Sequence, residues 1–245
     1  MKNLKYLLFE KQHRLGKLTL TTFELALLGG CAYFITVMES QVLIQIAVLI
    51  VAVVFHEIAH GYVAKLLGDP TADRLGRLSL NPLKHIDPMG SIGLPLILAL
   101  SGSGFLIGWA KPVPVDPSYF KRPLQDMMWV AIAGPLTNFS LALISSMALK
   151  AIVFMNVPMS IPIYYVGVFL QLSVVYNVVL GVFNLIPIPP LDGSKILMFF
   201  LPEDIRFTYL RLEPYGMMIV IMLALFGVFG TVLDFFAAPI IQFLL

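Results

Sequence analysis

Apolar positions dominate this chain in long runs, which polar and proline-rich stretches separate. A helix needs about 20 mostly apolar residues to cross a bilayer. Runs of this kind cover Leu18–Met38, Val42–Leu67, Met127–Leu149, Ile161–Phe183 and Tyr215–Leu233. A short helix is expected over Gly193–Phe200, whereas the prolines of Asn184–Pro190 exclude a regular helix there. The pattern predicts an all-α polytopic membrane protein with about five full transmembrane helices.

The segment Ile92–Trp109 decides the predicted topology. It is apolar, but glycines and Pro95 interrupt it, which favours a re-entrant hairpin buried against protein over a sixth span. If the hairpin enters and leaves on one side, fifteen of the sixteen Lys and Arg residues face that side, and Lys150 is the exception. The positive-inside rule then makes that side the cytoplasm. A single crossing would instead translocate the last two basic loops.

Composition supports a lipid environment and excludes several other classes. Of the 245 residues, 59% are hydrophobic and 12% are charged, and the mean hydropathy is +0.90. Soluble domains carry about 25% charged residues. The net charge of +2, without a basic stripe, indicates no nucleic-acid partner. The single cysteine, Cys31, permits neither an intrachain disulfide nor a cysteine zinc cluster.

The candidate chemistry begins with the sequence His56-Glu57-Ile58-Ala59-His60 inside the second apolar run. Positions i and i+4 share one face of a helix, so two imidazoles there can bind one zinc ion. Glu57 is then close enough to act as general base toward a zinc-activated water. Ionisable residues at membrane depth are expensive and usually functional. The alternative is a polar contact between helices, or a proton relay.

The depth of this motif follows from helix geometry. At 1.5 Å per residue, His56 lies about 21 Å from the outer end of the run at Val42. In a hydrocarbon core of about 30 Å, the site is about 9 Å from the inner surface. Water must therefore reach it through a cavity on the cytoplasmic side.

A catalytic zinc needs a third protein ligand, and Asp192 is the best candidate. The other histidines are His13 and His85. Asp192 follows the proline-stiffened segment at the inner end of an apolar run, and the hairpin topology brings it to the side of His56 and His60. The alternative is that Asp192 caps the helix Gly193–Phe200.

Five stretches together resemble the site-2 protease family of intramembrane zinc metalloproteases. They are His56–His60, Asn81–Pro88, Gly108–Val115, Ala133–Asn138 and Asn184–Gly193. The resemblance implies a single zinc held by His56, His60 and Asp192, with Glu57 as catalytic base. It also implies prokaryotic relatives, an inner-membrane location, and substrates that are membrane proteins or remnant peptides. Many relatives carry a PDZ or CBS domain, and the chain is expected to be a compact form without either.

The expected organisation is one membrane metalloprotease domain over residues 1–245. It comprises a cytoplasmic basic N-terminus (1–17), a catalytic core (42–200) and a C-terminal membrane segment (215–245). Asn138 and Asn184 are candidates for binding substrate backbone or the oxyanion of the reaction. For both, interhelical packing is the alternative.

Two other functions are compatible with the sequence. One is a non-proteolytic membrane binding protein on the same scaffold, and the other is a metal transporter or sensor. The substrate and the oligomeric state are not predicted.

Overall fold

The computed structural model describes residues 13–15, 18–20, 40–93, 97 and 109–245. The chain divides into two units, Met1–Gln45 and Ile46–Leu245. In the first unit, β1 (His13–Leu15) and β2 (Leu18–Leu20) pair as an antiparallel hairpin. The predicted span Leu18–Met38 is therefore wrong at its start, where Leu18-Thr19-Leu20 alternates apolar and polar positions as a strand does. Residues 21–38 of that span lie outside the described residues.

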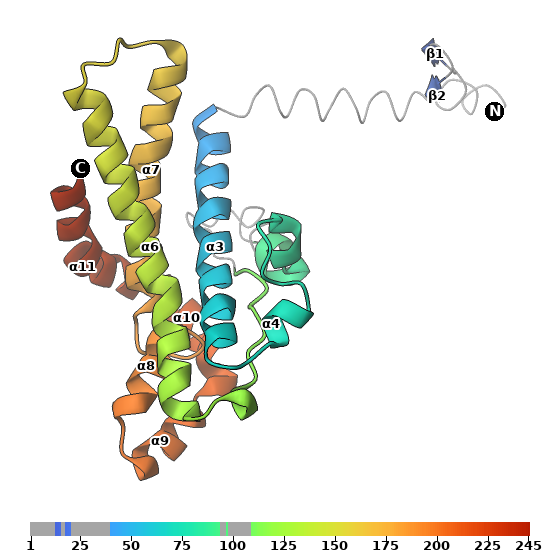
Figure 1. Ribbon diagram of the computed structural model, residues 1–245, viewed down its shortest axis with the longest axis vertical. Coiled ribbons are helices and arrows are strands. Elements are labelled where there is room, and N and C mark those ends of the chain that lie inside the picture. Colours follow the sequence, from blue (N-terminus) through green and yellow to red (C-terminus); the bar gives the residue numbers. More distant parts are fainter. Residues whose placement is uncertain (1–12, 16–17, 21–39, 94–96, 98–108) are drawn as a thin grey trace, which may run out of the picture. The chain divides into compact units, whose positions relative to one another are not determined.

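Helices make up most of the described chain (Figure 1). The elements are α3 Ser40–Leu66, α4 Thr71–Arg74, the 3-10 turn η1 Pro82–His85, the π-type turn η2 Pro88–Gly93, the 3-10 turn η3 Pro117–Tyr119, α6 Pro123–Phe154, α7 Ile161–Asn184, α8 Asp192–Phe200, α9 Glu203–Leu210, the 3-10 turn η4 Glu213–Tyr215, α10 Gly216–Leu225 and α11 Val228–Leu244. The all-α membrane class is confirmed. Four segments of the described residues are long and apolar enough to cross a bilayer: Val42–Leu66, Pro123–Phe154, Ile161–Asn184 and Glu203–Leu225.

The last predicted span, Tyr215–Leu233, is wrong as a single helix. Helix α10 ends at Leu225, and Gly227 adopts a left-handed conformation with φ of 73° before α11 begins. A residue with a side chain is strained at such a φ, so glycine is suited to this break. The predicted hairpin Ile92–Trp109 lies mostly outside the described residues, because residues 94–96 and 98–108 are not described.

Local sequence explains where the two central helices begin. Pro123 occupies the first turn of α6, where a missing N–H costs nothing. The Asp126 carboxylate accepts a hydrogen bond from the backbone N–H of Arg122 at 2.9 Å. Helix α7 starts after Ser160, whose hydroxyl accepts from the N–H of Ile163. These caps satisfy backbone donors that a helix start leaves unpaired.

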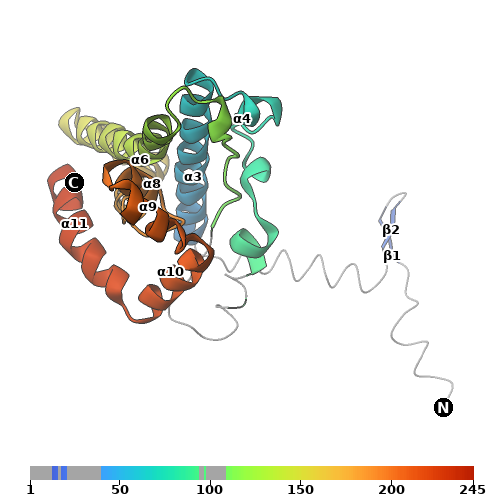
Figure 2. The ribbon, with the colours of Figure 1, turned by 90° about the horizontal axis from the view of Figure 1, so that it is seen from below.

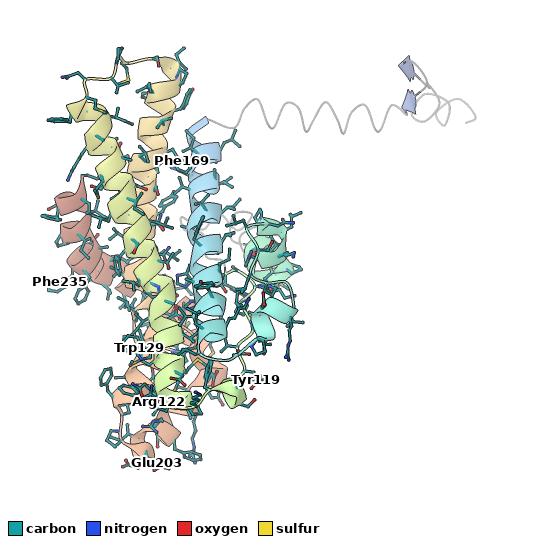
Figure 3. The ribbon with its side chains drawn as sticks, viewed as in Figure 1. Tyr119, Arg122, Trp129, Phe169, Glu203 and Phe235 are labelled. Carbon is teal, nitrogen blue, oxygen red and sulfur yellow. The ribbon has the colours of Figure 1, made fainter. Side chains whose placement is uncertain are left out.

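Figure 2 shows α10 and α11 as an arc that ends at the C-terminus. One apolar core of the second unit lies where α6, α7 and α11 meet (Figure 1). Its buried members are small or β-branched, apart from one leucine: Ala142, Val174, Val178, Val182, Ala237 and Leu244. Large apolar side chains on the outer helix faces are exposed instead, including Trp129 and Phe235 (Figure 3). This distribution suits a protein whose outer surface meets lipid.

Candidate metal centre

Three side chains from two helices converge at one point. His56 and His60 project from one face of α3, as their spacing predicts, and Asp192 comes from the first turn of α8. Asp192 Oδ2 lies 3.2 Å from Nε2 of each histidine, and the two Nε2 atoms are 3.0 Å apart. All three residues are less than a tenth exposed. Among the described residues, His56, His60 and Asp192 form a metal-ligand group, in which the donor atoms are close enough together to hold one metal ion.

The donor set fits zinc. Zinc bonds to histidine nitrogen and carboxylate oxygen are about 2.0–2.2 Å long, so tetrahedral ligands should lie about 3.3–3.5 Å from one another. The observed separations of 3.0 and 3.2 Å are close to these edges. Three protein ligands also leave one position open, as a catalytic zinc site requires.

Helix α6 fixes the orientation of both imidazoles from behind. Nδ1 of His60 lies 2.7 Å from the backbone carbonyl of Val130, and Nδ1 of His56 lies 2.6 Å from Oδ1 of Asn138. Both Nε2 atoms therefore face Asp192. Gly134 lies between these contacts, and a Cβ there would meet atoms of both imidazoles at 2.5 Å. Glycine is needed at this position because the rings approach the α6 backbone so closely.

Asp192 is placed by the turn that precedes α8. Its side chain does not cap the helix, because Leu191 is the N-cap residue and no side-chain cap bond is present. A Cβ on Gly193 would lie 2.2 Å from the carbonyl oxygen of Leu185, so this glycine allows the turn to close tightly. The second carboxylate oxygen of Asp192 faces Lys195 Nζ at 3.8 Å.

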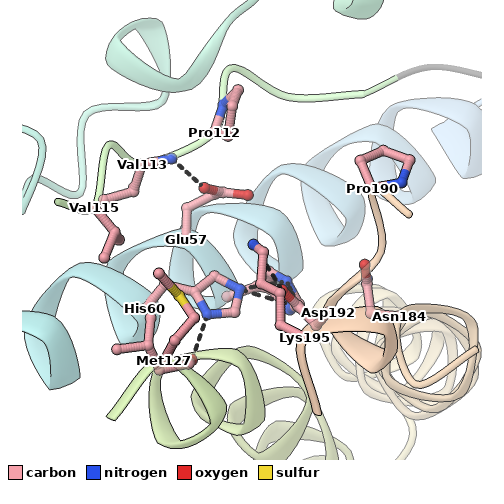
Figure 4. A pocket seen from close by; sticks show the side chains of 12 residues that line it. Glu57, His60, Pro112, Val113, Val115, Met127, Asn184, Pro190, Asp192 and Lys195 are labelled. Carbon is pink, nitrogen blue, oxygen red and sulfur yellow. Dashed lines mark hydrogen bonds and ion pairs between the residues drawn. The ribbon is translucent and has the colours of Figure 1, made fainter. Parts of the chain in front are cut away.

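A cavity of about 300 Å³ adjoins the three residues (Figure 4). Its lining includes Glu57, Asn184 and Lys195 together with the metal-ligand group. Glu57 Oε2 accepts a hydrogen bond of 2.8 Å from the backbone N–H of Val113. The Glu57 carboxylate is therefore held beside the metal-ligand group by a backbone donor.

The segment around Val113 is anchored at both ends. The carbonyl of Lys111 accepts from Arg77 Nη2 at 2.7 Å, and its N–H donates to the carbonyl of His85. The N–H of Asp116 donates to buried Asp69 at 2.8 Å. Hydrogen bonds from the hydroxyl and the backbone N–H of Ser118 lower the pKa of the exposed Asp116 carboxyl. This carboxylate consequently remains an acceptor for the turn that follows at mildly acidic pH.

The two candidate asparagines occupy different positions. Asn184 lines the cavity, and its side-chain N–H donates to the Leu180 carbonyl at 3.0 Å. Asn138 is fully buried behind His56 and is not among the residues that line the cavity. His85 is buried away from the metal-ligand group, and its Nε2 pairs with the Ser79 carbonyl.

Sequence reasoning missed the contacts that support this centre. The backbone groups of Val130 and Val113 have no sequence signal, because any residue except proline supplies an N–H and every residue supplies a carbonyl. Asn177, which pairs with Asn138, did leave a signal. It lies in an apolar run four residues after Ser173, so the two form a polar stripe on one helix face.

Two histidines, an aspartate and a nearby glutamate, set among helices that can cross a bilayer, define a membrane metallohydrolase. The chain belongs to peptidase family M50, the site-2 protease family. A model of that family matches residues 164–227, which include Asn184–Gly193.

Curated relatives support the same family. The chain is 41% identical over 177 residues to "Putative zinc metalloprotease YwhC" of Bacillus subtilis, which covers 71% of this chain and 77% of the relative. It is 32% identical over 188 residues to "Putative zinc metalloprotease Rip2" of Mycolicibacterium smegmatis, covering 74% of this chain and 66% of that protein. No solved structure matches the chain. The chain is thus a zinc metalloprotease with helices suited to a membrane, as its sequence motifs predict.

Proposed function

We propose that this protein cleaves peptide bonds of membrane-spanning segments, or of remnant peptides, within or beside the bilayer. The observation that carries the proposal is the position of the metal-ligand group on an apolar helix. His60 lies six residues before the end of the span Val42–Leu66, which is about 9 Å at 1.5 Å per residue. A substrate that reaches this depth must itself enter the membrane region.

Glu57 is the proposed general base. When zinc is bound, it makes water more acidic and polarises the carbonyl under attack. Glu57 takes a proton from the attacking water as the new C–O bond forms, and it gives this proton to the leaving amine nitrogen as the C–N bond breaks. The N–H of Val113 holds one Glu57 oxygen, which leaves the other available to the cavity.

Asn184 is the proposed donor to the oxyanion. Its amide lies on the cavity, and the hydrogen bond to Leu180 uses one of its two N–H groups. The second N–H is available to a substrate carbonyl. Such a fixed donor lowers the barrier because it acts on charge that develops in the transition state.

The proposed orientation places the metal centre toward the cytoplasm, with the basic N-terminus (1–17) on the same side. Helix α6 connects Arg122, at the start of the helix, to Lys150 near its other end. Helix α6 has 32 residues and is therefore long enough for its two ends to lie on opposite sides of the hydrocarbon core. The charge distribution of the loops then favours Lys150 as the outward residue.

The substitution Glu57→Gln tests the proteolytic mechanism. Candidate single-pass membrane proteins are co-expressed with each variant, and cleavage is followed together with the zinc content of the purified enzyme. Removal of a general base should slow cleavage by about 10²–10⁴-fold. Zinc should be retained, because Glu57 is not among the ligands. Glu203→Gln makes the same chemical change at an exposed position on α9 and should leave cleavage unchanged.

Normal cleavage by Glu57→Gln would refute the assignment of the base. A wild-type protein that binds zinc and cleaves none of the candidates would favour a binding or transport role instead.

A further inference from the structure

A row of buried polar side chains lies between α6 and α7 and leads away from the metal centre. It consists of Asn138 and Ser145 on α6 and of Ser173 and Asn177 on α7. All four are less than a tenth exposed, and the same two helices carry the fully buried apolar residues Ala142 and Val174. Polar groups at membrane depth are costly unless they are paired, so a row of four such residues indicates a structural or functional role.

The orientations of the two asparagine amides in the row are fixed by backbone carbonyls, which only accept hydrogen bonds. Asn177 Nδ2 lies 2.9 Å from the Ser173 carbonyl, so the Asn177 amide nitrogen must point there. Its oxygen therefore faces Asn138 and accepts from Nδ2 of that residue at 2.9 Å. The same Asn138 nitrogen lies 3.3 Å from the carbonyl of Ala52. Both acceptors require the nitrogen of Asn138 on their side.

These hydrogen-bond directions determine which ring nitrogen of His56 carries the proton. Because the nitrogen of Asn138 donates to Asn177 and to the Ala52 carbonyl, the oxygen of Asn138 faces Nδ1 of His56 at 2.6 Å. An oxygen in this place requires a proton on Nδ1, and the lone pair of the neutral ring is then on Nε2, toward Asp192. A histidine that binds a metal is commonly fixed by a hydrogen bond at its other nitrogen.

We propose that Asn177 is a positioning residue for the zinc ligand His56, acting through the amide of Asn138. This inference rests on the metal centre proposed above. Without Asn177, the Asn138 amide keeps one of its two carbonyl acceptors and is freer to turn its nitrogen toward His56. That orientation would favour the tautomer whose lone pair is on Nδ1, and Nε2 would no longer be ready to bind zinc. His60 does not depend on the row, because the Val130 backbone carbonyl fixes its ring.

A packing role and a positioning role predict different results. Asn177→Leu replaces the amide with an apolar side chain of similar size, and Ser145→Ala removes the hydroxyl that donates to Ser173 Oγ at 2.9 Å. Ser145→Ala loses one hydrogen bond of the row, whereas Asn177→Leu loses the bonds of Asn177 to Asn138, to Ser173 Oγ and to the Ser173 carbonyl. Only Asn177→Leu removes a contact that orients Asn138. Ser145→Ala leaves the Ser173 carbonyl, and thus the Asn177 amide, in place.

The experiment measures zinc affinity of detergent-purified full-length protein by competition with a chromophoric chelator, and the visible spectrum of the Co²⁺ form. Thermal stability of the metal-free proteins is recorded in parallel. We expect Asn177→Leu to bind zinc about tenfold more weakly and to alter the Co²⁺ spectrum, since partners of metal ligands are worth about 10–100-fold in affinity. Ser145→Ala should keep wild-type zinc affinity. Asn177→Ala, which adds no bulk, replaces Asn177→Leu if the leucine variant does not fold.

The outcomes separate this inference from the proposed function. Wild-type zinc affinity and an unchanged Co²⁺ spectrum in the Asn177 variant would overturn the positioning role while leaving the metal centre intact. Equal losses of zinc affinity in the Asn177 and Ser145 variants, in step with stability, would assign the row to packing alone. A wild-type protein without stoichiometric zinc would instead refute the metal centre itself.

Discussion

Gly134→Ala tests how closely α6 must approach the two imidazoles. The added methyl carbon would lie 2.5 Å from Cε1 of His56 and 2.5 Å from Nε2 of His60. Ordinary carbon contacts begin near 3.4 Å, so the rings or the α6 backbone must move by about 0.9 Å. Metal–ligand distances tolerate only about 0.2 Å. The substitution should therefore weaken the metal centre without removing any ligand.

The size of the effect follows from the cost of overpacking. Extra bulk in a closely packed site costs about 1–3 kcal/mol. If this cost falls on the zinc-bound state, affinity decreases by about fivefold to about 140-fold, because about 1.4 kcal/mol corresponds to a factor of ten. Cleavage should decrease at least as much at limiting zinc.

The assay compares zinc affinity and cleavage of Gly134→Ala with those of Gly167→Ala. Gly167 also lies on a long apolar helix, but no atom is within 4 Å of a Cβ built there. Its substitution should leave both quantities at wild-type values. The reasoning fails if Gly134→Ala binds zinc as tightly as the control protein does.

Two further predictions concern the base and the orientation. Val113→Pro removes the N–H that donates to Glu57 and should slow cleavage about tenfold to a hundredfold with zinc content unchanged, since hydrogen bonds to charged groups contribute about 1.5–3 kcal/mol. Val113→Ala keeps this N–H and should remain active, so equal rates for both variants would contradict the role of this N–H in holding Glu57. In a Cys31→Ser background, Lys150→Cys should react with a membrane-impermeant thiol reagent on intact cells, whereas Lys121→Cys should react only after lysis; the reverse labelling would invert the proposed orientation.

Periodicity and spacing anticipated the main helices because lipid imposes a simple rule on them. The runs beginning at Val42, Met127 and Ile161 correspond to α3, α6 and α7, although the observed helices differ from the predicted runs by a few residues at their ends. Sequence hydropathy does not register a break such as Gly227, because one residue in a left-handed conformation hardly changes the mean over a window. The run at Tyr215 was therefore predicted as continuous.

The metal-ligand group was predictable for a different reason. Histidine and aspartate are common metal ligands, so two histidines at helical spacing and an aspartate after a rigid proline segment indicate a metal site from sequence alone. The supporting contacts are less visible, because they depend on which helices pack together. The sequence alone does not show that Gly134 and Asn177 lie near His56, because this depends on how α6 and α7 pack.

The two histidines of the metal-ligand group differ in how a point mutation can remove the hydrogen bond that holds each ring. His60 is held by a main-chain oxygen, which every amino acid at position 130 provides, so this hydrogen bond does not depend on the side chain there. His56 is secured by a side chain, which a single codon change can delete. Substitutions of Asn138 should therefore remove the hydrogen bond to an imidazole, whereas substitutions of Val130 should act only through the packing of its buried side chain.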